Sequence, residues 1–332
     1  MKRLGLTIGL EGASVTDALE LCREAEGLGY TDAWSAEVGG ADGFAPLAAL
    51  AGSTSRMRLG TAIVPVFTRP PALLAMSAST VQQLSGGRFV LGLGTSSDVI
   101  VSAWMGGSFE RPLDRLREYV EVLRDLFAGK KVSHAGETVS VNGFRLQIDP
   151  GSPPPIYLAA LGPKACRLAG EVADGVIFFM KSVAGAEQGL GWVAEGARAA
   201  GRDVAELDCV IRLPVAVEED EEMMRFMARR LVTTYAAVDV YNRSLSAQGF
   251  EAEANAVKEA WRTGDRDQAN AAVTDDMMEQ LLVMGDAASC RARLEEFRNA
   301  GVKTPVLLPV SVAGDPVERA ERIRAAVRAL AP

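Results

Sequence analysis

The sequence predicts an α/β fold, a (β/α)8 TIM barrel with two insertions. Short apolar runs begin at residues 4, 31, 59 and 88, with spacings of 27, 28 and 29 residues, and a helical pattern follows each run. This period is typical of parallel strands joined by helical crossovers. Eight such runs can be counted in the 332 residues, which favours a closed barrel, with a doubly wound open sheet as the alternative fold.

Each predicted element has a local signal in the residues. The strands are short and rich in β-branched and aliphatic residues, and we place them at 4–10, 31–37, 59–64, 88–95, 155–161, 174–180, 207–217 and 304–310. The helices carry apolar residues on one face, and we place them at 14–30, 43–54, 70–84, 111–129, 163–172, 183–200 and 315–330. Ser14 or Thr16 can cap the first helix, and proline opens the third.

Two segments interrupt the alternation. Residues 130–150 follow the fourth unit and alternate between polar and apolar side chains, which predicts an inserted hairpin. Residues 218–300 are rich in Ala, Glu, Arg and Met, and they predict a helical insertion without strands ahead of the eighth strand. We therefore expect one barrel domain over residues 1–332 that carries both insertions.

The bulk composition excludes several classes of partner. The net charge is −8 and no run of Lys or Arg stands out, so nucleic acids and acidic membrane surfaces are not expected as partners. No stretch of about 18 apolar residues could span a membrane. The N-terminus enters a strand without the pattern of a signal peptide, and the four cysteines include no CxxC pair. These features predict a cytoplasmic protein with reduced thiols.

The chain holds a single histidine, His134. Zinc sites built on histidine and iron sites with two histidines need more than one imidazole, and a Ser-His-Asp relay needs one beside a nucleophile. His134 lies in the predicted hairpin, where an exposed or capping role is the ordinary expectation. We therefore expect no metal site and no catalysis by histidine.

The working face of such a barrel is formed by the loops that follow the strands. Those loops include Glu11, Glu37 and the segments 62–69, 95–98, 161–164, 179–181 and 309–311. Glu37 is either an acid at the barrel mouth or a salt-bridged rim residue. Lys181 follows the sixth strand. It is a candidate contact for a phosphate or carboxylate, or a Schiff-base lysine, with an ordinary surface lysine as the default.

Three short motifs end or follow predicted strands on this face. "GTAIVPVFTRPP" at 60–71 ends the third strand in proline and charge, an abrupt exit for a buried strand. "GLGTSS" at 92–97 suits either a closely packed strand end or backbone amides that approach a cofactor. "ALGPKA" at 160–165 starts a helix, whose unpaired amides can hold an anion beside Lys164.

The stretch "LGTAIVPVFTRPPALLAMSASTVQQLSGGRFVLGLGTSSDVIVSAWMG" at 59–106 resembles the third and fourth βα units of the bacterial-luciferase-like superfamily. The resemblance extends over nearly the whole chain through "WSAEVGGADGFAPLAALAGSTSRMRLGT", "YLAALGPKACRLAGEVADGVIF" and "GDAASCRARLEEFRNAGVKTPVLLP". The pattern is most similar to the reductases that use the deazaflavin coenzyme F420, such as methylenetetrahydromethanopterin reductase. Those families are single barrels and commonly homodimers.

The resemblance implies a site as well as a fold. It implies a non-prolyl cis peptide between Ala62 and Ile63 that backs the cofactor ring and leaves the other face of the ring open to substrate. Glu37 is implied as a polar catalytic group near the ring or substrate, and Trp104 as a pocket wall. The implied cofactor shell is Ala62, Ile63, Gly94, Thr95, Ser96, Ala160, Leu161, Gly162 and Pro163, with Lys164 and Lys181 available for an anionic tail or substrate.

The function that the resemblance implies is an oxidoreductase that transfers a hydride between C5 of F420 and a small organic substrate. An FMN-dependent monooxygenase and a non-catalytic flavin-binding protein are the alternatives. Two positions depart from the relatives. Met105 follows Trp104 where many have histidine, and Thr7 stands where methylenetetrahydromethanopterin reductase has an acid. Because of these two differences, the resemblance does not define the substrate or the proton donor of this protein.

Overall fold

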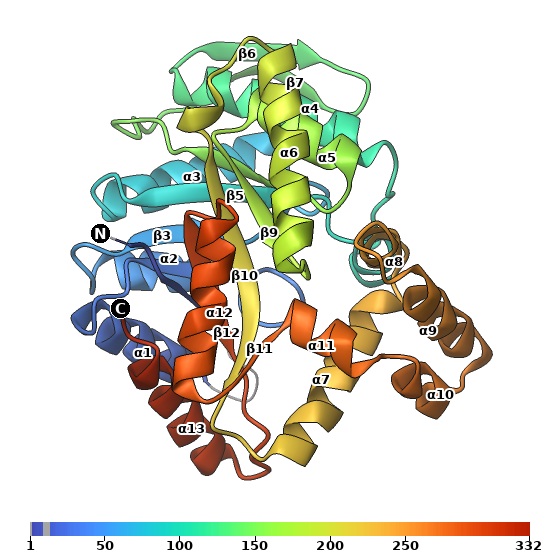
Figure 1. The fold of residues 1–332 in the computed structure, drawn as a ribbon. Coiled ribbons are helices and arrows are strands. Elements are labelled where there is room, and N and C mark those ends of the chain that lie inside the picture. The colour runs from blue at the N-terminus through green and yellow to red at the C-terminus, as the bar shows by residue number, and fades with distance from the viewer. Residues whose placement is uncertain (1, 9–13) are drawn as a thin grey trace.

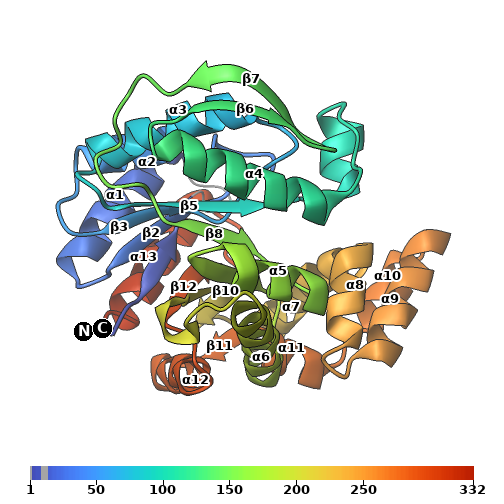
Figure 2. The same ribbon diagram turned by 90° about the horizontal axis from the view of Figure 1, so that it is seen from above.

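In the computed structural model, which describes residues 2–8 and 14–332, eight parallel strands close into a barrel. The hydrogen-bonded order runs β10-β12-β1-β2-β3-β5-β8-β9, and β9 pairs with β10 to complete the ring. Helices surround the strands, and the two ends of the chain lie close together (Figure 1, Figure 2). This closure confirms the barrel and excludes the open sheet.

The observed elements follow the predicted alternation. The barrel strands are β1 (Gly5–Thr7), β2 (Asp32–Ser35), β3 (Arg58–Thr61), β5 (Phe89–Gly94), β8 (Ile156–Ala159), β9 (Gly175–Phe179), β10 (Asp208–Val217) and β12 (Thr304–Pro309). The surrounding helices are α1 (Val15–Gly27), α2 (Ala45–Ala51), α3 (Pro71–Leu84), α4 (Pro112–Phe127), α5 (Pro163–Val172), α6 (Val183–Ala199), α12 (Ala287–Asn299) and α13 (Pro316–Ala329). Each predicted strand and helix overlaps an observed one.

Local chemistry explains where several helices begin. Ser14, not Thr16, caps α1: its side chain accepts a hydrogen bond from the Asp17 amide, and the Asp17 side chain accepts one from the Ser14 amide. Proline occupies the first turn of α3, α4, α5 and α13, where the missing amide hydrogen has no partner to lose. The starts of these helices are thus set largely by their own first residues.

The predicted hairpin is present after the fourth unit. Strands β6 (Lys131–Ala135) and β7 (Ser140–Arg145) pair antiparallel in a separate sheet. The hairpin lies over α3 and α4 on the outside of the barrel (Figure 2). Arg115 of α4 joins the turn of this hairpin to the segment that follows β3, since it donates to the Thr138 carbonyl at 2.8 Å and to the Val66 carbonyl at 3.1 Å.

The segment 218–300 is not free of strands, contrary to the prediction. It contains β11 (Val283–Gly285), which pairs with Val215–Val217 at the far end of β10. A strand of three residues is too short to show an alternating pattern, and only the overhang of β10 gives it a partner. The rest of the insertion is helical, with α7 (Glu221–Ala236), α8 (Asp239–Ser246), α9 (Glu251–Thr263), α10 (Arg266–Ala271) and α11 (Asp275–Leu281).

The inserted helices form a small body beside the barrel (Figure 1, Figure 2). Their buried side chains, among them Val232, Phe250 and Met277, make a second hydrophobic core, which also includes Met180 after β9. This body touches the ends of two barrel strands. The Ser244 hydroxyl lies 3.3 Å from the Leu161 carbonyl oxygen after β8, and Gln248 Oε1 accepts a hydrogen bond from the Ser182 amide after β9. The insertion thus forms part of the wall at the carboxyl end of the barrel.

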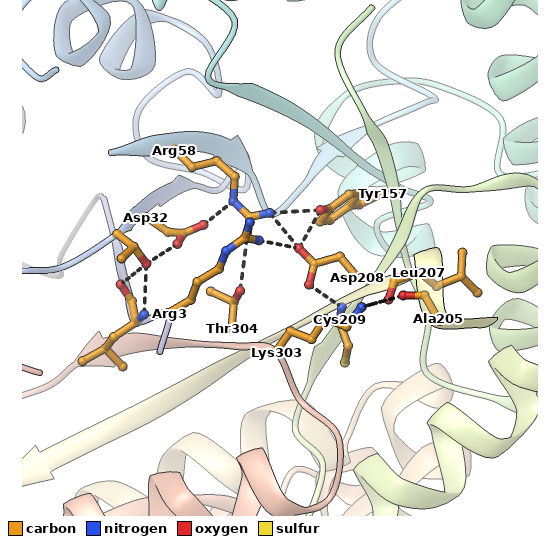
Figure 3. A network of polar contacts seen from close by, with 12 residues as sticks. Arg3, Asp32, Arg58, Tyr157, Ala205, Leu207, Asp208, Cys209, Lys303 and Thr304 are labelled. Carbon is orange, nitrogen blue, oxygen red and sulfur yellow. Dashed lines mark hydrogen bonds and ion pairs between the residues drawn. The ribbon is translucent and has the colours of Figure 1, made fainter. Parts of the chain in front are cut away.

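A buried ionic network closes the opposite, amino-terminal end of the barrel (Figure 3). Arg58 at the start of β3 forms ion pairs with Asp32 of β2 and, at 2.7 Å, with Asp208 of β10. The same guanidinium donates to the Tyr157 hydroxyl and to the Thr304 hydroxyl at 3.0 and 3.2 Å. Burial raises the pKa of Asp208, but Arg58 and the Tyr157 hydroxyl outweigh burial and lower the pKa overall. These contacts tie together the first residues of five strands.

Candidate active site

The third strand breaks at the carboxyl end of the barrel. β3 stops at Thr61, and β4 (Val64–Pro65) resumes the pairing with the end of β5. The peptide between Ala62 and Ile63 is cis, as the resemblance implies. The Ala62 amide donates to the Ser35 carbonyl at 2.6 Å, and the Ile63 carbonyl accepts from the Glu37 amide at 3.0 Å. The abrupt exit of "GTAIVPVFTRPP" therefore builds an irregular step at the barrel mouth.

Two glycines of β5 make room for this step. A Cβ at Gly92 would lie 1.8 Å from the Thr61 carbonyl oxygen, which is fixed backbone. A Cβ at Gly94 would lie 2.8 Å from two side-chain carbons of Ile63 and 3.3 Å from the Ala159 Cβ. Close packing against fixed backbone thus requires Gly92, whereas Gly94 lies between the side chains of Ile63 and Ala159, and we call the surface of these three residues the cradle.

The loop after β5 carries Thr95, Ser96 and Trp104. Ser96 has a φ of 60°, a left-handed conformation that is uncommon outside glycine. Trp104 ends the short π-helix Val99–Trp104, and its side chain is 60% exposed. A Cβ at Gly39 would lie 3.7 Å from its ring. Trp104 therefore stands at the rim of the mouth, and its role as a pocket wall stays a prediction.

The loop after β8 leads into the start of α5. The side chain of Ala160 is buried in the layer between strands and helices, so that only its backbone can reach the mouth; Ala159 contributes the inward side chain. Gly162 precedes α5 without a side-chain cap, and Pro163 occupies the first turn. Lys164 is exposed. The amides of this first turn are oriented as in known anion sites.

Lys181 is not the surface lysine that was the default expectation. Its side chain is 1% exposed, and Nζ donates to the Leu161 carbonyl at 2.9 Å. Phe178 and Trp192 surround the amine, and burial lowers its pKa while the nearby thiol of Cys166 partly opposes this. The packing of α6 over β9 decides this burial, and a single sequence does not display it. Through its bond to the Leu161 carbonyl, Lys181 anchors the loop before α5 from the buried side of that loop.

Glu37 is a salt-bridged residue at the mouth. Its Oε2 pairs with Arg69 Nη2 at 2.7 Å and accepts from the Gly43 amide at 3.1 Å, and its Oε1 lies 3.3 Å from the Thr68 hydroxyl. Arg69 also pairs with Asp42. Arg69, the charged residue in "FTRPP", thus links the loop after β3 to the loop after β2 through its ion pairs with Glu37 and Asp42. With its oxygens occupied, Glu37 is suited to positioning these loops.

Sequence reasoning missed one charged residue of the mouth, Arg212. It lies within β10, and its Nη1 donates to the Ala62 carbonyl oxygen at 3.0 Å. Its guanidinium also lies 5.5 Å from the centre of the Phe179 ring. The signal was available, because an arginine inside the apolar strand "LDCVIRLPVAV" needs a polar partner or a function.

Other predicted features lie elsewhere. Glu11 falls outside the described residues. His134 is half-buried rather than exposed, because its ring faces Glu118 of α4 with Nε2 3.5 Å from the carboxylate. Within the described segments, no three His, Cys, Asp or Glu side chains gather as a metal site would require. All four cysteines are buried and unbridged. No helix in the described part of the chain has the length and apolar character needed to cross a membrane.

A cleft of about 890 Å³ opens at the amino-terminal end of the barrel, beside the network of Arg58 and Asp208. Its lining carries several cations, but they are held locally: Lys2 and Arg298 pair with Glu295, and Lys303 donates to the Leu207 carbonyl. In barrels of this kind the chemistry lies at the carboxyl ends of the strands. We therefore assign the candidate site to the mouth around Ala62 and Ile63.

The fold and the mouth define a member of the luciferase-like class of barrels. The sequence profile of the luciferase-like monooxygenase family matches residues 2–304, and the chain belongs to this family. A protein of Mycobacterium tuberculosis, provisionally named a coenzyme F420-dependent oxidoreductase, is 30% identical over 92% of this chain and 94% of its own. The 5,10-methylenetetrahydromethanopterin reductase of Methanolobus tindarius is 30% identical, over 94% and 95%. The solved F420-dependent tetrahydromethanopterin reductase of Methanopyrus kandleri superimposes with a TM-score of 0.76, 24% identity and 97% coverage of both chains.

Proposed function

We propose that this protein is a coenzyme F420-dependent oxidoreductase that acts on a small organic substrate by hydride transfer. The observation that carries the proposal is the cradle between Ile63, Gly94 and Ala159, at the step where the third strand breaks. Glycine leaves a flat, apolar surface there, which suits one face of a planar ring system. The choice of F420 is supported by the names of the relatives that match more than nine tenths of this chain.

The residues around the cradle fit such a cofactor. Ala62 and Ile63 would meet the ring, and the backbone of Gly94, Thr95 and Ser96 would follow its edge. The amides of Gly162 and Lys164 at the start of α5 would hold the anionic tail, whereas Pro163 between them has no amide hydrogen to donate. When bound, the deazaflavin would supply the hydride chemistry, and the protein would supply binding, orientation and electrostatics.

Two anchors keep both sides of the cradle in place. On one side, Glu37 joins Arg69, so that the loops after β2 and β3 cannot move apart. On the other side, Lys181 and Ser244 both donate to the Leu161 carbonyl before α5. Preorganised walls reduce the ordering that binding would otherwise require. Glu37 and Lys181 thus already have partners in the structure, and the catalytic role expected of Glu37 stays a prediction.

An FMN-dependent monooxygenase is the second candidate. The first turn of α5 could hold the phosphate of FMN as well as the tail of F420, and the family carries the description of a monooxygenase. A deazaflavin has carbon in place of the reactive ring nitrogen and reacts poorly with oxygen. The two candidates therefore differ both in cofactor and in their need for oxygen.

We expect the purified protein to bind F420 with a Kd of about 1 μM or lower, roughly −8 kcal/mol, and FMN at least about tenfold more weakly. Fluorescence titrations of the apoprotein with each cofactor measure both constants. Tighter binding of FMN, with oxygen consumption on reduction, would assign the protein to the monooxygenases. If the protein retains a bound cofactor but shows no turnover with any reductant, a non-catalytic flavin-binding protein would be favoured.

Gly94→Ala should raise the Kd for F420 about tenfold while the fold loses only about 1 kcal/mol of stability. The new Cβ would lie 2.8 Å from Ile63, whose side chain is partly exposed and can rotate into the cradle. Gly191→Ala is the matched control, because a Cβ at this exposed position of α6 meets nothing within 4 Å. Unchanged F420 binding in Gly94→Ala would place the ring elsewhere.

A further inference from the structure

Arg212 reaches across the whole barrel. In the ring of strands, β10 and β3 are four places apart in either direction, so they face each other across the interior. The side chain of Arg212 crosses the interior from β10, and its Nη1 donates to the Ala62 carbonyl at 3.0 Å. The guanidinium therefore lies in the middle of the mouth, next to the peptide that forms the cradle.

No negative charge compensates this cation among the described residues. Every ion pair within 4.0 Å found there involves other side chains, and Arg212 Nε is buried without a hydrogen-bond partner. Arg58 at the other end of the barrel is different, since it pairs with both Asp32 and Asp208. Arginine keeps its proton at neutral pH, and an unpaired charge inside a protein is costly. An uncompensated cation at a barrel mouth is suited to a ligand of opposite charge.

An aromatic wall stands beside the cation. Tyr235 of α7 and Tyr241 of α8 pack edge to face, with ring centres 4.9 Å apart, and Phe179 at the end of β9 lies 4.9 Å from Tyr235 and 6.2 Å from Tyr241. All three rings and Arg212 are partly exposed. Burial lowers the pKa of the guanidinium, and the two nearby phenols partly oppose this. The wall thus offers apolar surface within reach of one fixed positive charge.

Arg212 links this wall to the cradle, because its guanidinium lies 5.5 Å from the centre of the Phe179 ring and donates to the Ala62 carbonyl at 3.0 Å. Phe179 and Arg212 come from β9 and β10, and both tyrosines come from the insertion that covers the ends of these strands. A ring resting on Ile63 and Gly94 would turn its free face toward them. In this respect the inference rests on the proposed function, because it takes the free face of the cofactor as the side where the substrate binds.

We propose that the substrate is an organic oxyanion, a carboxylate or phosphate ester, whose negative group pairs with Arg212 and whose carbon skeleton packs on Phe179, Tyr235 and Tyr241. A guanidinium forms two parallel hydrogen bonds with either group, and Nε and an Nη are the pair that remains after the bond to Ala62. The aromatic wall would select substrates with a flat or apolar body over small hydrophilic acids.

The test uses three probes of the same shape on the F420-loaded protein and on the apoprotein: benzoate, phenyl phosphate and the neutral benzamide. Calorimetric titration should show at least one of the two anions binding about tenfold or more tightly than benzamide, the size of one charge-assisted contact. In Arg212→Met this preference should fall to within about twofold, and Arg212→Lys should retain part of it. The ratio of the dissociation constants for benzoate and phenyl phosphate shows which oxyanion the mouth prefers.

Arg145→Met is the charge-matched control, since Arg145 is exposed on β7, far from the mouth. The anion preference of this variant should equal that of the wild type. Circular dichroism checks that each variant folds, and if Arg212→Met does not, Arg212→Gln and Arg212→Lys carry the comparison. Equal affinity of charged and neutral probes for the wild type would overturn the proposal, as would an anion preference that survives undiminished in folded Arg212→Met or Arg212→Gln. Failure of F420 to bind would count against the proposed function only, because the apoprotein titrations report on Arg212 independently.

Discussion

Asp208→Ala is expected to lower the free energy of unfolding by about 3–5 kcal/mol, the usual cost of removing one partner from a buried ion pair. Asp208 accepts hydrogen bonds from Arg58 at 2.7 Å and from the Tyr157 hydroxyl at 2.7 Å, and its side chain is 10% exposed. The change leaves Arg58 with Asp32 alone and leaves the Tyr157 hydroxyl without its acceptor. Urea unfolding at pH 7 measures the loss.

The same carboxyl predicts a pH dependence with a definite sign. Its folded pKa is lowered, so the unfolded chain binds the proton more readily, and the stabilisation is complete above the unfolded pKa of about 3.9. It is lost as the pH falls through the lower folded value. Asp208→Asn keeps the shape and removes this titration. The stability difference between wild type and Asp208→Asn should therefore shrink below about pH 4, and a constant difference down to pH 2 would contradict the assignment.

Gly92→Ala is the second substitution with a large expected effect, a loss of about 3 kcal/mol or more and a fall in Tm of roughly 5 °C or more. The added Cβ would lie 1.8 Å from the Thr61 carbonyl oxygen and 2.7 Å from Ile177. The carbonyl cannot yield easily, because the Thr61 hydroxyl donates to the Gly92 carbonyl at 2.7 Å and accepts from the Gly92 amide at 2.8 Å. Strands β3 and β5 would have to separate at the mouth.

Gly191→Ala provides the comparison for thermal unfolding. Gly191 is an exposed position inside α6 with open space around it, and alanine there should stabilise the helix by about 0.5–1 kcal/mol. The two substitutions add the same methyl group and should move Tm in opposite directions. A Gly92→Ala protein as stable as the wild type would mean that the strand end is not packed as described.

The mouth was predicted in part. The loops after the third, fourth and fifth strands were assigned to it, and the structure brings Ile63 and Gly94 into contact there. The roles of Glu37 and Lys181 could not be decided from the chain alone. Glu37 depends on Arg69, 32 residues away, and Lys181 depends on the packing of α6. Each outcome is set by a partner that arrives only when the barrel closes.

The sequence by itself determined the alternating strands and helices, a capped start of the first helix at Ser14 or Thr16, and the break of the third strand in "GTAIVPVFTRPP", because these follow from neighbouring residues and local backbone preferences. Only the tertiary structure decided that Arg58 meets Asp208 and that Arg212 meets Ala62, each pair separated by 150 residues. The physical reason is closure of the ring: parallel strands far apart in sequence point alternate side chains into one interior, and a charged side chain there takes its partners from the opposite wall.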